Sequence, residues 1–156
     1  SFYTMRAKNM NHLMAPLHRL VEESSAPFIG IGDGGNELGM GKVIENIRAK
    51  IPLGETIGCV VPAHYLIASS VSNWGGYALA AGAALFRSSC DASSSVSEWL
   101  ERCLPGEQDE KRLLERCVEV GCRDGVSGRI EATVDGMPLE TSLQCLRDIR
   151  MAALGK

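Results

Sequence analysis

The stretch PFIGIGDGGNE, residues 27–37, decides how this chain folds. It begins as a short apolar run and ends in glycines and acids, which is typical of a buried strand that leads into a loop. Apolar residues at helical spacing follow over 38–51, and Pro52 and Gly54 then stop the pattern. A strand, a loop and a helix in this order favour an α/β fold with parallel strands.

The rest of the chain carries further expected elements of both kinds. Asn73 is expected to cap a helix that runs to Phe86, and other helices are expected at 5–23, 97–104, 107–120 and 139–153. Strands are expected at 56–61 and at 129–134, the second leading into a tight turn at Asp135-Gly136. The segment 65–71 fits a strand or a helix, and 88–97 reads as an exposed loop. The expected architecture is a layered sandwich in which helices flank a mainly parallel sheet.

Length and composition limit the class of protein. A chain of 156 residues can bury one core, so we expect a single α/β domain over 1–156. A net charge of −3 argues against a nucleic-acid partner, and no apolar run is long enough to span a membrane. Because the chain starts at Ser1 without Met, we expect an internal cut rather than a natural start.

Six cysteines stand at irregular spacings along the chain. Several fall on apolar helical faces, where a free thiol behaves as a small hydrophobic group. Cys117 and Cys122 are five residues apart, which fits neither a C-x-x-C zinc pair nor two thiols on one helical face. We therefore expect reduced, structural thiols and a reducing compartment such as the cytosol or the mitochondrial matrix.

The loop after the first strand is the strongest candidate for a ligand site, since six of the residues in 30–41 are glycine. Its G-x-G-x-x-G spacing matches a dinucleotide fingerprint only weakly, because Asp33 and Glu37 would put negative charge beside a pyrophosphate. A phosphate-binding P-loop fits worse, because Val43 follows Gly41-Lys42. The remaining interpretation uses the acids themselves.

Asp33, Asn36 and Glu37 place carboxylate and amide groups on a glycine frame at the expected N-terminus of a helix. Negative charge is favourable there, by about 0.3–1 kcal/mol at exposed sites. Such carboxylates can hold a substrate ammonium, bind a hard cation or transfer protons. The structural alternative is that Asp33 and Asn36 stabilise a turn and that Glu37 caps the helix.

A second unusual segment is SNWGGY, residues 72–77. Asn73 offers hydrogen bonds, Gly75 lets the backbone approach a ligand, and Trp74 has an indole N–H that needs a partner when buried. The alternative is a helix cap with Trp74 in the core. A third segment, residues 127–138, is more simply a hairpin-like turn.

Three stretches together resemble the C-terminal domain of the D-glutamate cyclase family. They are GDGGNELGMG at 32–41, VSNWGGYAL at 71–79, and DGVSG with VDGMP within 124–138. The resemblance implies a lyase that interconverts D-glutamate and 5-oxo-D-proline plus water in the mitochondrial matrix. It also implies that 1–156 is a C-terminal fragment of a longer chain, with an upstream domain of the same chain as its partner. One departure is His64, which stands where relatives tend to carry an acid; a structural role for this histidine is the simpler interpretation.

Within this resemblance, the hypothesis assigns catalysis to Asp33 and Glu37, which would handle protons or the substrate amine. Substrate binding is assigned to Gly34, Gly35, Asn36, Asn73, Trp74 and Gly75. No cofactor is expected, although a divalent cation fits the same acids. The alternatives are a non-catalytic module that binds an acidic amino acid or a nucleotide, and a metal-assisted hydrolase that uses Asp33 and Glu37 as ligands.

Overall fold

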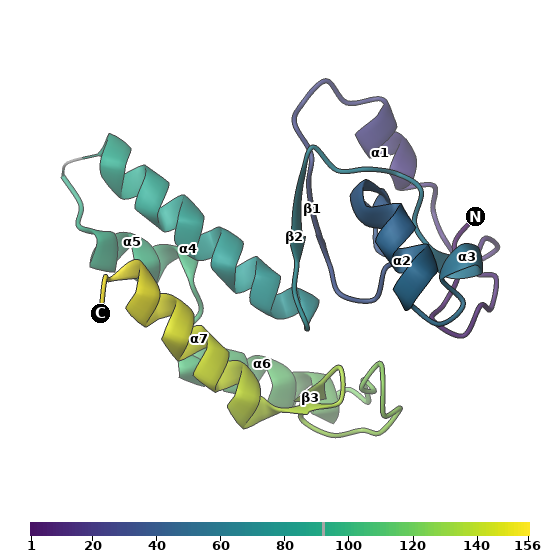
Figure 1. Ribbon diagram of the computed structural model, residues 1–156. Coiled ribbons are helices and arrows are strands. Elements are labelled where there is room, and N and C mark those ends of the chain that lie inside the picture. The colour runs from purple at the N-terminus through teal and green to yellow at the C-terminus, as the bar shows by residue number, and fades with distance from the viewer. Residues whose placement is uncertain (92) are drawn as a thin grey trace. The chain divides into compact units, whose positions relative to one another are not determined.

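The computed structural model describes residues 1–91 and 93–156 (Figure 1). The chain divides into two compact units, Ser1–Gly75 and Gly76–Lys156, and each is described by itself. The expectation of one domain over 1–156 stays a prediction.

The first unit is organised around a pair of parallel strands. β1 (Ile29–Gly32) pairs with β2 (Tyr65–Ala68), so that Ile29 lies opposite Tyr65 and Gly32 opposite Ala68. Between them come the 3-10 helix η1 (Gly41–Val43) and the helices α2 (Ile44–Lys50) and α3 (Gly54–Ile57), and the short helix α1 (His18–Glu22) precedes them. The pairing confirms the first expected strand and settles 65–71 as a strand over its first four residues.

Small residues let the backbone pack closely beside β1. A Cβ atom on Gly30 would lie 3.0 Å from Ala63 Cβ and 3.1 Å from Gly39 Cα. Gly39 has φ +106°, a conformation that favours glycine, and Ala63 donates a backbone hydrogen bond to its carbonyl. Gly30 and Gly39 therefore allow close packing of the backbone beside β1. The core of the unit also includes Met40, Ile47, Ile57 and Val71.

Two expected elements of the first unit are wrong. The helix at 5–23 exists only at α1, because the preceding segment turns back on itself in a bridge between Tyr3 and Asn9, with Ala7 at φ +57°. Asn11 Oδ1 accepts from Phe2 N at 2.7 Å, which diverts the backbone from helical bonding. The strand at 56–61 is also wrong, since α3 occupies its start.

The second unit is mainly helical. α4 (Ser72–Cys90) begins in the first unit and continues into the second, followed by α5 (Val96–Cys103) and α6 (Glu107–Glu119). The hairpin strands β3 (Thr133–Val134) and β4 (Met137–Pro138) then lead into α7 (Leu139–Ala153), the yellow helix in Figure 1. The buried residues of this unit include Tyr77, Ala81, Ala84, Leu100, Leu104, Leu143 and Leu146.

The helices of the second unit agree closely with expectation. α5, α6 and α7 are confirmed, and α5 begins with a capping box in which Ser95 and Glu98 bond each other's backbone N–H groups. The turn at Asp135-Gly136 is confirmed with φ of +52° and +76°, although the strand before it is shorter than expected. The expected loop at 88–97 is shortened at both ends by α4 and α5. Asn73 is not the cap of α4, because the helix already includes Ser72.

The expected fold class is confirmed in its coarse form, a mixture of helices and strands with a small parallel sheet. A layered sandwich is not confirmed, because the parallel sheet in the described part of the chain has two strands. The described residues contain no helix that is long and apolar enough to cross a membrane. All six cysteines are free in the structure, and Cys90 and Cys122 are exposed rather than packed on a buried face.

Candidate functional site

The glycine loop connects the carboxyl end of β1 to η1. Gly35 in this loop has φ +98°, and its carbonyl accepts a hydrogen bond from Cys59 N at 2.9 Å. A Cβ atom on Gly35 would lie 2.9 Å from Ile47 Cγ2, so the loop sits directly on the buried side of α2. The loop is held as a defined turn, with both its conformation and its packing fixed by glycine.

The Glu37 carboxylate accepts hydrogen bonds from two backbone N–H groups of this loop. Its Oε1 accepts from Gly34 N at 2.9 Å and its Oε2 accepts from Gly35 N at 2.7 Å. The carboxylate therefore holds the two backbone N–H groups that the sequence hypothesis gave to the substrate. Glu37 does not cap the helix that follows, because α2 begins only at Ile44. Its charge is used to stabilise the turn.

Asp33 joins the glycine loop to the start of α4. Its Oδ2 accepts from Ser72 N at 2.7 Å and also from the Ser72 hydroxyl in a very short hydrogen bond. The carboxylate thus takes the place of a helix cap, where the helix dipole favours its negative charge. The helix N-terminus that contacts Asp33 is therefore that of α4, and not that of the helix next in the chain.

Asp33 and Glu37 differ in how much of each carboxylate is used. Both hydrogen bonds that Asp33 accepts from the described residues go to Oδ2, whereas Glu37 uses both oxygens. Both side chains are half-buried. Within the described part of the chain, Oδ1 of Asp33 accepts no hydrogen bond, whereas both oxygens of Glu37 do.

Asn36 ties the loop to the N-terminal segment through a hydrogen bond from its Nδ2 to Tyr3 O at 2.9 Å. Its side chain is half-buried, and one amide hydrogen is used in this contact. The loop is therefore restrained on three sides, by the first residues of the chain, by α2 and by α4.

The start of α4 packs against the end of β1. A Cβ atom on Gly75 would lie 2.6 Å from Ile31 Cγ2 and 3.1 Å from Ser69 Oγ, so only glycine fits here. Trp74 is half-buried and Asn73 is exposed. The structure thus brings together the two segments that the sequence singled out separately, and the Asp33–Ser72 contact lies where they meet. Ser72 itself was not among the candidates, although a serine at a helix start was its signal.

His64 has a structural role in these contacts. Its Nδ1 accepts from Phe28 N at 2.9 Å, and its carbonyl accepts a short hydrogen bond from Lys42 Nζ. The ring is exposed and secures the entry to β1. The simpler interpretation of this residue agrees with these contacts.

Asp124 lies in the DGVSG motif but was not among the predicted site residues, although its carboxylate accepts four hydrogen bonds. Its Oδ1 accepts from Val126 N and Ser127 N, and its Oδ2 accepts from Thr133 Oγ1 and Gly136 N, all at 2.6–2.9 Å. Burial raises the pKa of this carboxyl, but the four hydrogen bonds outweigh it and hold the pKa well below its ordinary value. An aspartate followed by glycine and serine was the available signal.

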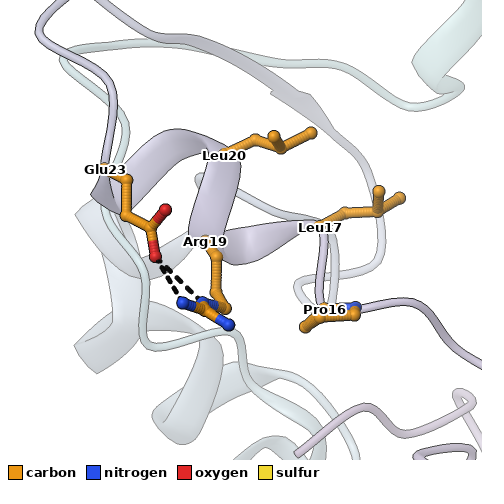
Figure 2. Close-up of a pocket in the computed structure, with 5 residues that line it drawn as sticks. All are labelled: Pro16, Leu17, Arg19, Leu20 and Glu23. Atoms are coloured by element: carbon orange, nitrogen blue, oxygen red, sulfur yellow. Dashed lines mark hydrogen bonds and ion pairs between the residues drawn. The ribbon is translucent and has the colours of Figure 1, made fainter.

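A shallow pocket lies away from these residues, beside α1. Figure 2 shows its lining residues Pro16, Leu17, Arg19, Leu20 and Glu23. Arg19 and Glu23 pair with each other at 2.8 Å and both are well exposed, so this pocket offers little unpaired charge for a ligand. Among the described residues, no group of three or more His, Cys, Asp or Glu side chains is close enough together to hold a metal ion. Asp33 and Glu37 would need further ligands to form such a site.

Comparison with known proteins agrees with the motifs that meet at this site. Residues 1–150 match the family described as D-glutamate cyclase-like, C-terminal. A human protein named "D-glutamate cyclase, mitochondrial" is 36% identical over 172 aligned positions, which cover 97% of this chain. The chain spans 28% of the length of that relative. The resemblance noted in the sequence is therefore confirmed, and the chain belongs to the D-glutamate cyclase-like C-terminal family.

Proposed function

We propose that this chain supplies active-site residues to an enzyme that interconverts D-glutamate and 5-oxo-D-proline plus water, a carbon–oxygen lyase reaction in the mitochondrial matrix. The name of the human relative supports the reaction and the mitochondrial location. The observation that carries the proposal is the Asp33–Ser72 contact, which joins two family motifs around a half-buried carboxylate with one oxygen left for a ligand.

The reaction requires two proton transfers. The amino nitrogen forms a bond to the side-chain carboxyl carbon, and a carbon–oxygen bond of that carboxyl breaks. The ammonium gives up two protons in becoming an amide, and the departing oxygen leaves with both of them as water. Because the attack is intramolecular, holding glutamate in a folded conformation supplies much of the rate enhancement. The protein must still accept and return protons and stabilise a tetrahedral oxyanion.

We assign the substrate ammonium to Asp33. Its Oδ1 can accept a hydrogen bond from the ammonium while Oδ2 stays on Ser72, so substrate binding breaks no existing contact. An ionised aspartate beside the ammonium can also take its first proton once the nitrogen begins to form the new bond.

We assign the second proton to Glu37, and we expect its protonation to change the hydrogen bonds of Gly34 N and Gly35 N. A carboxylate that gains a proton becomes a weaker acceptor, so the N–H groups of Gly34 and Gly35 would be released as Glu37 takes up a proton. Those two donors would then serve the developing oxyanion. Asn36 and Asn73 are assigned to the remaining substrate carboxylate, with Trp74 and Gly75 as the adjacent wall.

The test is an assay of both directions of the reaction in the full natural protein that contains this chain. We expect Asp33→Asn to lower kcat by about 100-fold or more, the usual size of a general acid–base contribution. The matched control is Asp109→Asn, because Asp109 also accepts a backbone N–H, from Gly106, but lies on α6. Its kcat should stay at the wild-type value.

Two outcomes would overturn the proposal. One is wild-type turnover in folded Asp33→Asn. The other is calorimetric binding of D-glutamate or 5-oxo-D-proline by the full protein with no interconversion, which is the behaviour of a non-catalytic binding module.

A further inference from the structure

The C-terminus of α6 carries two cysteines in a specific backbone motif. Cys122 N donates to Cys117 O at 2.9 Å, and Gly121 N donates to Val118 O at 3.0 Å. Gly121 has φ +84°. This pair of bonds around a left-handed glycine is the Schellman motif, in which the residue after the glycine contacts the residue five positions earlier. In this chain both of those residues are cysteine.

The motif limits how far apart the two cysteines can be. The carbonyl oxygen of Cys117 and the amide nitrogen of Cys122 are 2.9 Å apart, and each atom is a fixed covalent distance from its own Cα. The Cα–Cα distance therefore cannot exceed about 6.8 Å, which is within the range that disulfides span. A spacing of five residues places two cysteines on different faces of a continuous helix. The Schellman motif at the end of α6 brings Cys117 and Cys122 close together instead.

The two thiols also differ in accessibility. Cys122 is exposed and Cys117 is half-buried. An oxidant from solution would meet Cys122 first, and Cys117 would be the neighbour that resolves the adduct.

We propose that Cys117 and Cys122 form a redox-active dithiol site that is oxidised to an intramolecular disulfide by small-molecule disulfides of the glutathione type. The Cys122 thiolate attacks one sulfur of the small disulfide, whose S–S bond breaks and releases one thiol. The Cys117 thiolate then attacks the Cys122 sulfur and releases the second thiol. The two cysteines together lose two electrons and two protons, and the small disulfide gains them as two thiols.

The experiment uses the full natural protein, reduced and then incubated with oxidised glutathione. Remaining thiols are alkylated and the protein is digested with trypsin. Cleavage after Arg116 and Arg123 gives one peptide, CVEVGCR, that holds both cysteines. We expect this peptide to lose the mass of two hydrogen atoms and to carry no alkyl group. Exposed Cys90, alone in the peptide from 88 to 102, reports whether the oxidant reaches an exposed thiol.

Two variants separate the motif from simple reactivity. Cys122→Ser should abolish the oxidised peptide. Gly121→Ala keeps all six cysteines but opposes the positive φ that closes the motif, so it should lower the fraction of internal disulfide. The proposal is overturned if the wild-type peptide carries two alkyl groups or two glutathione adducts under conditions in which Cys90 is modified. It is also overturned if Gly121→Ala oxidises as readily as wild type.

Discussion

Two loops of this chain gather backbone N–H groups around carboxylates, and they do it differently. In the loop around 124–136, Asp124 is 7% exposed and accepts two hydrogen bonds at each oxygen. In the loop at 33–40, Glu37 takes two N–H groups and Asp33 uses one oxygen on Ser72, and both acids are half-buried. A buried carboxylate whose two oxygens both accept hydrogen bonds stabilises the conformation of its loop. A partly used and accessible one can also meet a ligand.

The largest stability effect is expected at the filled carboxylate. Asp124→Asn removes the negative charge and replaces an acceptor oxygen by an NH₂ group, so that part-buried hydrogen bonds such as the one from Gly136 N are lost. We expect the free energy of unfolding to fall by roughly 3 kcal/mol, at the upper end of what hydrogen bonds to a charged group contribute. Urea unfolding followed by circular dichroism measures it.

The same variant tests the division of roles between the loops. Turnover per folded molecule should stay at the wild-type level in Asp124→Asn, whereas Asp33→Asn should lose turnover with a smaller stability loss. A large fall in kcat for correctly folded Asp124→Asn would show that the two loops do not differ as described.

Acid should weaken the loop around Asp124 in particular. The pKa of this carboxyl lies below its ordinary value of 3.8 in the folded chain, because its hydrogen bonds outweigh the opposing effect of burial. A group with a lowered folded pKa adds stability above its unfolded pKa and loses it as the pH falls toward the folded value. Unfolding free energies measured between pH 7 and pH 3 should therefore decline at the acid end. Asp124→Asn should show a shallower decline, and equal slopes would contradict the assignment.

Some helices could be predicted from the sequence and others could not. α5, α6 and α7 were predicted closely, because each has an apolar period and clear end signals such as Ser95 or the Pro105-Gly106 break. The helix at 5–23 failed because asparagine side chains compete for the backbone there, which a periodicity of leucines does not register. Local hydrogen bonding decided against the apolar pattern.

The candidate site was predictable as two segments but not as one place. The glycine loop and the SNWGGY segment were recognised from composition and family resemblance, yet Ser72 as the partner of Asp33 depends on a contact between residues 39 positions apart. The hydrogen bonds from Gly34 N and Gly35 N to Glu37 could not be predicted either. The same sequence is compatible with a turn whose N–H groups are bonded and with one whose N–H groups are free.

Glycine-to-alanine changes compare the turns of the two loops. Gly35→Ala combines a positive φ of +98° with a Cβ atom 2.9 Å from buried Ile47, whereas Gly136→Ala combines φ +76° with an ordinary 3.4 Å contact to Val126. We expect losses of roughly 2 kcal/mol and roughly 1 kcal/mol in unfolding free energy, from left-handed strain with and without overpacking. Thermal and urea unfolding of both variants measures the difference. Equal losses would show that space around Gly35 is not limiting.

The smallest expected effect is at Gly75 and Gly76 of α4. There is no space for a side chain at Gly75, whereas there is space at Gly76. A Cβ atom on Gly76 would meet nothing within 4 Å, so Gly76→Ala should raise the unfolding free energy by up to about 1 kcal/mol through helix propensity alone. Gly75→Ala is its matched control, because its Cβ atom would lie 2.6 Å from Ile31 Cγ2 and should lower stability instead. Opposite signs in urea unfolding would show that the close approach of α4 to β1, beside the Asp33–Ser72 contact, depends on Gly75 and not on Gly76. A stabilising Gly75→Ala would contradict the packing on which the candidate site is built.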